Sequence, residues 1–211
     1  MNLLPEDVAG YIRRLCDRYD HPILLEMEER AEANNFPIVN RMAGSSLLVL
    51  ARSLGARRIF ELGSGFGYSA FWFATAAGPQ GEVFLTDGDH DNTLLSEDYL
   101  IRAGLADRCR FLTGDAVAQL DATPGDFDIV YCDIDKPGYP EAWEHAKSRV
   151  RIGGMYVCDN ALWSGRVADP DNHDLETQAI RAHNEAIFAD DHFASTIIPI
   201  RDGLIAAVRI A

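Results

Sequence analysis

The sequence predicts an α/β fold, in which a mostly parallel sheet is covered by helices on both faces and carries an antiparallel strand near its end. From residue 57 onward, short apolar or β-branched runs alternate with segments of helix length, as in parallel sheets whose strands are joined by crossover helices. The last two runs are separated only by residues 201–203, which is too short for a parallel crossover and suits a hairpin turn. The chain has 211 residues, of which 47% are hydrophobic and 25% charged, so it has the composition and length of one large globular domain.

The N-terminal part of the chain is expected to be helical, with Pro22 and Pro37 marking the boundaries between helices. Its three helices are expected at residues 5–19, 22–34 and 40–54. No repeat, low-complexity tract or linker separates them from the rest of the chain. We therefore expect one domain over residues 1–211, with the helices of residues 1–56 packed on it.

Seven strands and five further helices are expected after this part. Apolar and β-branched runs predict strands at residues 58–62, 82–87, 109–113, 127–133, 154–159, 193–200 and 204–210. The segments of helix length between or after them are residues 68–77, 92–103, 115–120, 139–149 and 174–189.

The charge balance excludes some classes of partner. The chain carries 19 Lys and Arg against 33 Asp and Glu, a formal net charge of −14, which disfavours binding to nucleic acids or anionic membranes. The first residues carry acids and a proline where a secretory signal would need a basic start and an unbroken apolar stretch, and no apolar run reaches the length of a membrane span. The four cysteines lie far apart, as free thiols in a reducing compartment would. We expect a cytoplasmic protein with no membrane partner.

A glycine-rich turn, Gly63-Ser64-Gly65-Phe66-Gly67, follows the first expected strand. In an open parallel sheet, ligands bind beyond the carboxyl ends of the strands, which is where this turn lies. Tight strand-to-helix turns also need glycine for purely structural reasons, so the turn alone leaves both interpretations open. Glu61 stands just before the turn, where a carboxylate would repel a pyrophosphate but suit a cationic ligand. S-adenosylmethionine, which carries a sulfonium and an ammonium and no phosphate, is such a ligand.

Two more acids follow the next strands. Asp87 ends the second strand and is placed to accept hydrogen bonds from ribose hydroxyls. Asp115, with Ala116 after it, would lie near an adenine amino group. Each acid also suits a structural role, Asp87 as a turn residue and Asp115 as a helix N-cap.

Polar side chains also end the fourth and fifth strands. If these strands are neighbours, Asp133, Asp159 and Asn160 converge at one edge of the sheet, where carboxylates this close need a cation between them. An all-oxygen set suits Mg²⁺ or another hard divalent ion. Lys136, three residues after Asp133, can act as a general base beside such an ion, although without Asp133 it would be interpreted as an ordinary surface lysine.

These motifs together resemble the metal-dependent O-methyltransferases related to catechol and caffeoyl-coenzyme A O-methyltransferases. The resemblance runs from about residue 40 to the C-terminus and rests on Glu61–Ser69, Gly114-Asp115-Ala116, Asp133–Tyr139 and Asp159–Val167. It implies a class I methyltransferase (Rossmann-like) fold with seven strands, the last antiparallel, and a homodimer. The sequence departs from the family pattern at Gly88-Asp89-His90-Asp91 after the ribose acid and at Pro137-Gly138 after Lys136.

The resemblance also assigns roles to individual residues. S-adenosylmethionine would be bound by Glu61, Gly63, Ser64, Gly65, Gly67, Tyr68, Ser69, Asp87, Asp115, Ala116 and Asp133. The metal would be bound by Asp133, Asp159 and Asn160. The acceptor would contact Lys136, Asn160 and Trp163. Two vicinal hydroxyls of a catechol-like small molecule would chelate the metal, Lys136 would remove a proton as the catalytic base, and the oxygen would attack the sulfonium methyl.

Other functions share parts of this pattern. A nicotinamide-dependent oxidoreductase has the same sheet and glycine turn but needs room for a pyrophosphate beside Glu61. A cofactor-binding module without catalysis would not need Asp133, Lys136, Asp159 and Asn160 together. Some relatives in the family methylate hydroxyuridine in tRNA, which the net charge disfavours unless Arg13-Arg14 or Arg57-Arg58 belongs to a basic patch.

Overall fold

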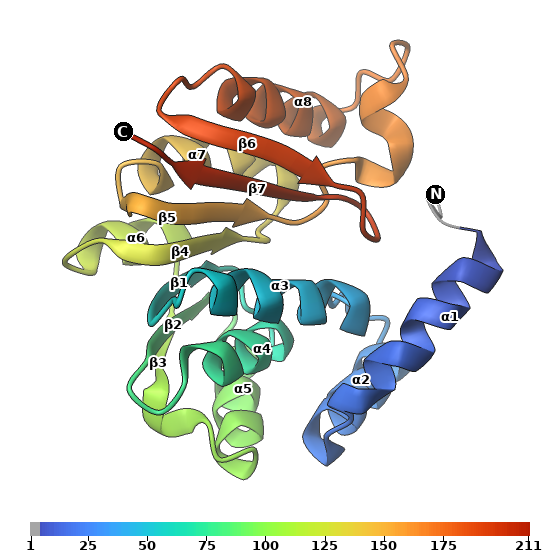
Figure 1. Cartoon of the computed structure of the whole chain (residues 1–211), viewed down its shortest axis with the longest axis vertical. Coiled ribbons are helices and arrows are strands. Elements are labelled where there is room, and N and C mark those ends of the chain that lie inside the picture. The colour runs from blue at the N-terminus through green and yellow to red at the C-terminus, as the bar shows by residue number, and fades with distance from the viewer. Residues whose placement is uncertain (1–4) are drawn as a thin grey trace.

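Seven strands form one sheet in the computed structural model of the protein, which describes residues 5–211 (Figure 1). The strand order is β3-β2-β1-β4-β5-β7-β6. Strands β1 to β5 pair in parallel, whereas β7 is antiparallel to both β5 and β6, as the short 201–203 turn predicts. The bounds of the strands are β1 Arg58–Leu62, β2 Glu82–Asp87, β3 Cys109–Thr113, β4 Phe127–Cys132, β5 Val150–Cys158, β6 Phe193–Ile198 and β7 Leu204–Arg209. The expected mostly parallel α/β sheet is thus confirmed.

Eight α-helices surround this sheet in the described part of the chain. Their bounds are α1 Glu6–Cys16, α2 Pro22–Ala33, α3 Arg41–Ser53, α4 Tyr68–Ala77, α5 His90–Arg102, α6 Ala116–Ala122, α7 Tyr139–Ala146 and α8 Leu175–Phe188. Short 3-10 turns occur at Asp17–Tyr19, Ala106–Arg108, Lys136–Gly138 and Trp163–Ala168. Among the helices of residues 5–211, none combines the length and the apolar character needed to cross a membrane. The first four residues of the expected domain lie outside the described residues.

The two faces of the sheet carry separate apolar clusters, because side chains alternate along each strand. On one face, Ile59 and Ile129 pack with residues of α2, α3, α4 and α5. On the other face, Phe60 and Val130 pack with residues of α6, α7 and α8. Figure 1 shows α3, α4 and α5 together on one side of the sheet, with α8 near the β6 end. Strands buried on both faces read as continuous apolar runs, which explains why β1 and β4 were recognisable in the sequence.

Helix boundaries follow from capping residues. The side chain of Asn40 accepts a hydrogen bond from the backbone N–H of Ala43 at the start of α3, and Asp174 does the same for Thr177 at the start of α8. Helix α5 begins at His90, two residues before the expected start, because Asp89 caps it through the N–H of Asp91. The departure from the family pattern after Asp87 therefore still yields a regular helix start.

The strand register brings the carboxyl ends of three neighbouring strands level with one another. Leu62 of β1 pairs with Cys132 of β4, and Cys132 pairs with Cys158 of β5. Because β7 runs in the opposite direction, its first residue, Leu204, and the preceding turn lie at this same edge. This edge includes the point between β1 and β4 where the strand order reverses, a usual place for a ligand in such sheets.

Candidate active site

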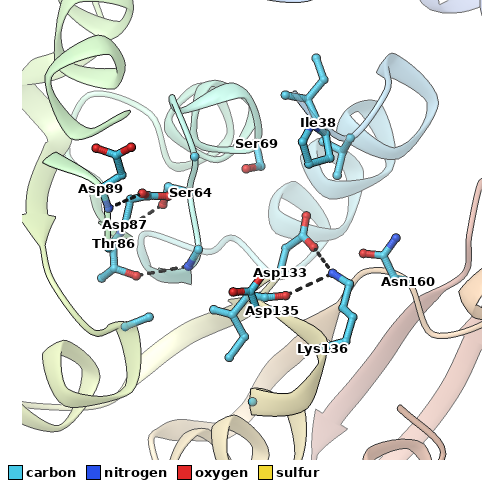
Figure 2. Close-up of a pocket in the computed structure, with 18 of the residues that line it drawn as sticks. Ile38, Ser64, Ser69, Thr86, Asp87, Asp89, Asp133, Asp135, Lys136 and Asn160 are labelled. Atoms are coloured by element: carbon cyan, nitrogen blue, oxygen red, sulfur yellow. Dashed lines mark hydrogen bonds and ion pairs between the residues drawn. The ribbon is translucent and has the colours of Figure 1, made fainter. Parts of the chain in front are cut away.

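A cavity of about 730 Å³ opens at the carboxyl edge of the sheet (Figure 2). Twelve of the predicted site residues line it: Gly63, Ser64, Gly65, Tyr68, Ser69, Asp87, Asp115, Ala116, Asp133, Lys136, Asn160 and Trp163. The other three predicted residues, Glu61, Gly67 and Asp159, are not among its lining residues. Figure 2 shows Asp87 and Ser64 toward one end of the cavity and Asp133, Lys136 and Asn160 toward the other.

The glycine turn adopts a backbone that side chains would obstruct. Gly63, Gly65 and Gly67 all have φ in the left-handed region, at 81°, 51° and 91°. A Cβ atom on Gly63 would lie 2.5 Å from the backbone oxygen of Asp133, which no real structure tolerates. The turn therefore needs glycine for its close approach to the end of β4, and the same approach leaves open space above it.

Glu61 lies buried beneath the turn, at zero exposure. Neither carboxylate oxygen has a hydrogen-bond partner of good geometry among the described residues. Burial raises the pKa of Glu61 to about 7, and the nearby hydroxyls of Ser69 and Ser64 oppose this only in part. A buried ionised acid without a partner is costly, which is the physical reason why the pKa of Glu61 is raised.

Tyr68 and Ser69 begin helix α4 behind the turn. Tyr68 lines the cavity, and its hydroxyl donates a hydrogen bond to Glu28 of α2. Glu28 in turn accepts from Arg41 of α3 at 2.8 Å. The N-terminal helices therefore hold a side chain of the cavity wall in place.

Asp87 and Asp115 stand at the ends of β2 and β3. One oxygen of Asp87 accepts from the backbone N–H of Asp89 at 2.8 Å and from Asn92 at 3.2 Å. Asp115 caps α6 through the N–H of Ala118 at 2.8 Å. The capping alternative considered for Asp115 is thus correct, and Asp115 lines the cavity as well.

Lys136 is held at the opposite end of the cavity by three hydrogen bonds. Its Nζ donates to Oδ1 of Asp133 at 3.0 Å, to the backbone oxygen of Ile134 at 3.2 Å and to the hydroxyl of Tyr139 at 2.9 Å. Tyr139 is fully buried and donates its own hydrogen bond to the backbone oxygen of Asp159. The Pro137-Gly138 pair forms a 3-10 turn and leaves Lys136 beside Asp133.

Asp159 lies next to Asp133, because β4 and β5 are parallel neighbours and end level with each other. Its side chain has zero exposure. Burial raises the pKa of Asp159 to about 7, the charge of Asp133 adds to this, and the Arg201 guanidinium opposes it. Asn160 follows in a left-handed conformation, with φ of 60°, and lines the cavity.

Arg201 is the main site residue that the sequence did not reveal. Its Nη1 lies 2.7 Å from Oδ2 of Asp159, and its Nη2 donates to the backbone oxygen of Ile38 at 2.9 Å. The next residue, Asp202, accepts from the side chain of Asn160 at 3.2 Å. The only signal in the sequence was the position of the 201–203 turn, which lies at the site because β7 is reversed.

The oxygen atoms at this end of the cavity fit a hard divalent cation. Asp133 and Asn160 line the cavity, and Oδ1 of Asp159 is buried without a hydrogen-bond partner among the described residues. Within residues 5–211, no group of three or more His, Cys, Asp or Glu side chains is arranged to hold a metal ion. A cation would therefore depend on the carboxamide of Asn160 and on oxygens of the acceptor in addition to the two carboxylates.

The wall near Lys136 is partly apolar. The Lys136 Nζ lies 5.9 Å from the centre of the Trp163 ring. Phe36, Ile38 and Val39, from the segment between α2 and α3, line the same cavity and were not expected as site residues. These residues lie between two expected helices, and no sequence pattern indicated that this segment reaches the edge of the sheet. An aromatic acceptor would find flat apolar surface here beside the polar cluster.

Comparison with known proteins finds one family over most of the chain. The sequence model described as O-methyltransferase matches residues 16–210. A catechol O-methyltransferase of Niastella koreensis is 31% identical over 202 residues, which cover 93% of this chain and 91% of that protein.

Two solved structures share the fold. The O-methyltransferase TomG of Streptomyces achromogenes, involved in tomaymycin synthesis and solved in complex with SAM, aligns with a TM-score of 0.84 at 28% identity over 91% of each chain. An O-methyltransferase of Bacillus cereus in complex with SAH aligns with a TM-score of 0.83 at 29% identity, over 90% of this chain and 91% of that one.

Proposed function

The chain belongs to the O-methyltransferase family, and from this premise we propose that it transfers a methyl group from S-adenosylmethionine to a hydroxyl of a small, catechol-like vicinal diol with the help of a divalent metal ion. One observation carries the proposal: a single cavity is lined at one end by a glycine turn and the acids Asp87 and Asp115, and at the other by a lysine that lies between an acid and an aromatic side chain. Two reactants bound at these ends would be held close together.

The cofactor end suits a cationic ligand without phosphates. Asp87 and Asp115 line that end, Glu61 lies buried beneath the turn, and the Lys and Arg side chains that line the cavity in the described residues are Lys136 and Arg201. A dinucleotide would bring its pyrophosphate against these acids, so the arrangement disfavours a nicotinamide-dependent oxidoreductase. The relatives TomG and the Bacillus cereus enzyme, solved with SAM and SAH, support the same choice.

Lys136 is the proposed catalytic base. Asp133, Ile134 and Tyr139 fix the position of its Nζ through the hydrogen bonds described above. To act as the base, Nζ would first lose a proton and give up one of these three hydrogen bonds, and its lone pair would then receive the proton of the acceptor hydroxyl. Trp163 and Ile38 would pack against the acceptor ring and exclude water from this end. S-adenosylmethionine, when bound, supplies a methyl group made electrophilic by its sulfonium. The contribution of these residues is therefore orientation of the acceptor oxygen and removal of its proton.

The proposed metal ligands are Asp133, Asp159 and Asn160. Their oxygens favour Mg²⁺ or a similar hard ion, and such an ion, when bound by a vicinal diol, makes one hydroxyl easier to deprotonate. The catechol O-methyltransferase of Niastella koreensis supports a diol acceptor.

A methyl-transfer assay tests this function. S-adenosylmethionine is incubated with a panel of catechols and with matched phenols that carry a single hydroxyl, with Mg²⁺ or with an excess of chelator. We expect methylation of the diols in Mg²⁺, and a large loss of rate in chelator and with the single-hydroxyl compounds. Equal rates with and without chelator would rule out the metal role, and the absence of any methylated product from either set would rule out the acceptor class.

The proposed partners are a small phenolic molecule and a second copy of the chain, in a cytoplasmic protein. The candidate basic pairs give no support to a tRNA acceptor. Arg13 pairs with Glu6, and Arg58 bonds to Glu82 and to backbone carbonyls at the end of the sheet opposite the cavity. The net charge of −14 also disfavours a tRNA acceptor.

A further inference from the structure

Arg201 makes contacts that the methyl-transfer proposal leaves unexplained. Its guanidinium lies between two parts of the site, at 2.7 Å from Oδ2 of Asp159 and at 2.9 Å from the backbone oxygen of Ile38. The Asp159 side chain has zero exposure and the Arg201 side chain has 29%. Arg201 lines the cavity whereas Asp159 does not, so the guanidinium covers the carboxylate on the cavity side.

The backbone of Arg201 belongs to the tight turn between β6 and β7, which the N–H of Gly203 closes on the oxygen of Ile200 at 2.9 Å. The φ of Arg201 is 54°, in the left-handed region that residues with a side chain rarely adopt. Such conformations persist where surrounding contacts hold them, and they concentrate at functional sites. Here the ion pair with Asp159 and the hydrogen bond to Ile38 hold the side chain.

Each of the two carboxylates proposed as metal ligands already has a basic partner in the protein. Asp133 pairs with Lys136 at 3.0 Å, and Asp159 pairs with Arg201. A divalent cation that binds the Asp159 carboxylate would meet a guanidinium already bound to it, and two cations on one carboxylate repel each other. The guanidinium occupies Oδ2 and leaves Oδ1 without a partner, so an ion on Oδ1 would share the carboxylate with Arg201 and would bind less tightly than to a carboxylate without that neighbour.

We propose that Arg201 is an internal counter-ion that competes with the divalent metal for Asp159 and so sets the metal affinity of the site. The inference rests on the metal role in the proposed function. In the metal-free protein, Arg201 neutralises a buried acid that would otherwise lack a partner. A metal ion held by Oδ1 would lie close to the guanidinium on Oδ2, and the repulsion between the two cations would lower the affinity of the protein for the ion. The remaining affinity would come from Asp133, Asn160 and the oxygens of the acceptor.

Calorimetric titration of the full-length protein with Mn²⁺, in the absence of acceptor, tests this competition. The main variant is Arg201→Gly, because glycine adopts the left-handed φ of this turn readily and so preserves the backbone while removing the cation. The control is Arg57→Gln, which removes the same charge from an exposed position at the opposite end of β1. We expect Arg201→Gly to bind Mn²⁺ at least about tenfold more tightly than the wild type, and the control to stay within about twofold.

Thermal unfolding provides a second readout. In chelator, Arg201→Gly should melt at a lower temperature than the wild type, because Asp159 loses its partner, and Mn²⁺ should raise the melting temperature of the variant by more than that of the wild type. An unchanged or weaker Mn²⁺ affinity in Arg201→Gly would overturn the inference while leaving the metal role intact if the wild type binds Mn²⁺. If neither protein binds Mn²⁺, the metal role itself fails and the inference fails with it.

Discussion

Lys136 combines a buried setting with three hydrogen-bond acceptors, which makes it the residue whose removal should have the clearest effect. We expect Lys136→Ala to reduce kcat for methyl transfer by about 10² to 10⁴, the range that a positioned general base contributes. Binding of S-adenosylmethionine should change little, because Lys136 lies at the acceptor end. The check is a steady-state assay together with calorimetric titration of the cofactor.

Lys147 provides a matched control for this substitution. It follows α7, pairs with Glu144 and does not line the cavity. Lys147→Ala should retain full activity. If Lys136→Ala retained activity as well, another group would have to accept the proton.

Glu61 makes the stability of the protein depend on pH. Burial raises its pKa from 4.5 to about 7. Between these values the folded protein holds a proton that the unfolded chain has released, so the free energy of unfolding falls as pH rises through this window and levels off above pH 7. The shift corresponds to about 3 kcal/mol. Glu61→Gln should remove this contribution, so that urea denaturation at pH 5 and pH 8 shows a smaller loss of stability than in the wild type.

Other groups also change the free energy of unfolding in this pH range. Their contributions are the same in the wild type and in Glu61→Gln, so they cancel when the two proteins are compared. Burial also raises the pKa of Asp159 to about 7, in both wild type and variant. Glu29→Gln, at an exposed position on α2, serves as the control and should follow the wild-type profile. Parallel profiles for Glu61→Gln and the wild type would show that the buried carboxyl does not titrate in this range.

Single residues differ in how far the sequence could predict them. Asp133 and Asp159 were recognisable because each directly follows an apolar run, and strand ends of a parallel sheet meet at one edge. Arg201 was not recognisable as a site residue. Its place at the same edge depends on β7 lying next to β5, which no local sequence pattern encodes. Asp159 was expected as a metal ligand at this edge. Its side chain is covered by Arg201, whose position no local sequence pattern predicts.

At the scale of elements, the glycine turn between β1 and α4 joins two parts of the site. We expect Gly63→Ala to weaken binding of S-adenosylmethionine at least about tenfold, because its Cβ would displace the backbone of Asp133 as well as strain the turn. Stability should fall by more than the 1 to 2 kcal/mol or so that a left-handed backbone costs alone. Calorimetric titration and urea denaturation measure the two effects.

A substitution at Gly55 distinguishes the cost of a left-handed backbone from the cost of displacing Asp133. Gly55 also has a left-handed backbone, with φ of 60°, but a Cβ added there would meet no atom of the described residues within 4 Å beyond its own chain neighbours. Gly55→Ala should therefore lose stability by the backbone cost alone and bind the cofactor normally. Equal effects of the two substitutions would mean that contact with the end of β4 is unimportant.

The helices and strands themselves were largely predictable, and their ends less so. The strand expected at 154–159 is longer, Val150–Cys158, because its first residues continue the pairing with β4 across an irregular register that no sequence pattern announces. Helix α7 ends at Ala146, three residues before the expected end. The role of segment 34–40 in the cavity wall could not be predicted from the sequence, because it depends on tertiary packing against the glycine turn.

At the scale of the whole molecule, the proposed homodimer has a candidate surface. Val8, Tyr11 and Leu15 of α1 are apolar and 41%, 54% and 56% exposed, and they lie three to four residues apart, on one side of the helix. Leu15 also borders a groove with Val49 of α3 and Ile198 of β6. Monomeric proteins rarely leave such a continuous apolar surface in water.

Light scattering coupled to gel filtration tests this assembly. The wild type should have twice the mass of one chain, and Leu15→Glu should shift it toward one chain, because a charge would be buried in the interface. Ile101→Glu, the same change at an exposed apolar residue of α5, should leave the mass unchanged. A wild type with the mass of one chain, or a dimer that persists in Leu15→Glu, would contradict this surface.

The order of the strands also determines how the two reactants are encoded. The chain completes β1, β2 and β3 before it crosses once to β4, so the glycine turn, Asp87 and Asp115 precede Asp133, Asn160 and Arg201 in one uninterrupted block. Apart from the wall at residues 36–39 and Asp133, which is proposed for both reactants, the residues proposed to bind the donor thus precede those proposed to bind the acceptor along the chain. A chimera joined to a relative near residues 123–126 should therefore change acceptor preference while keeping the proposed donor turn, Asp87 and Asp115.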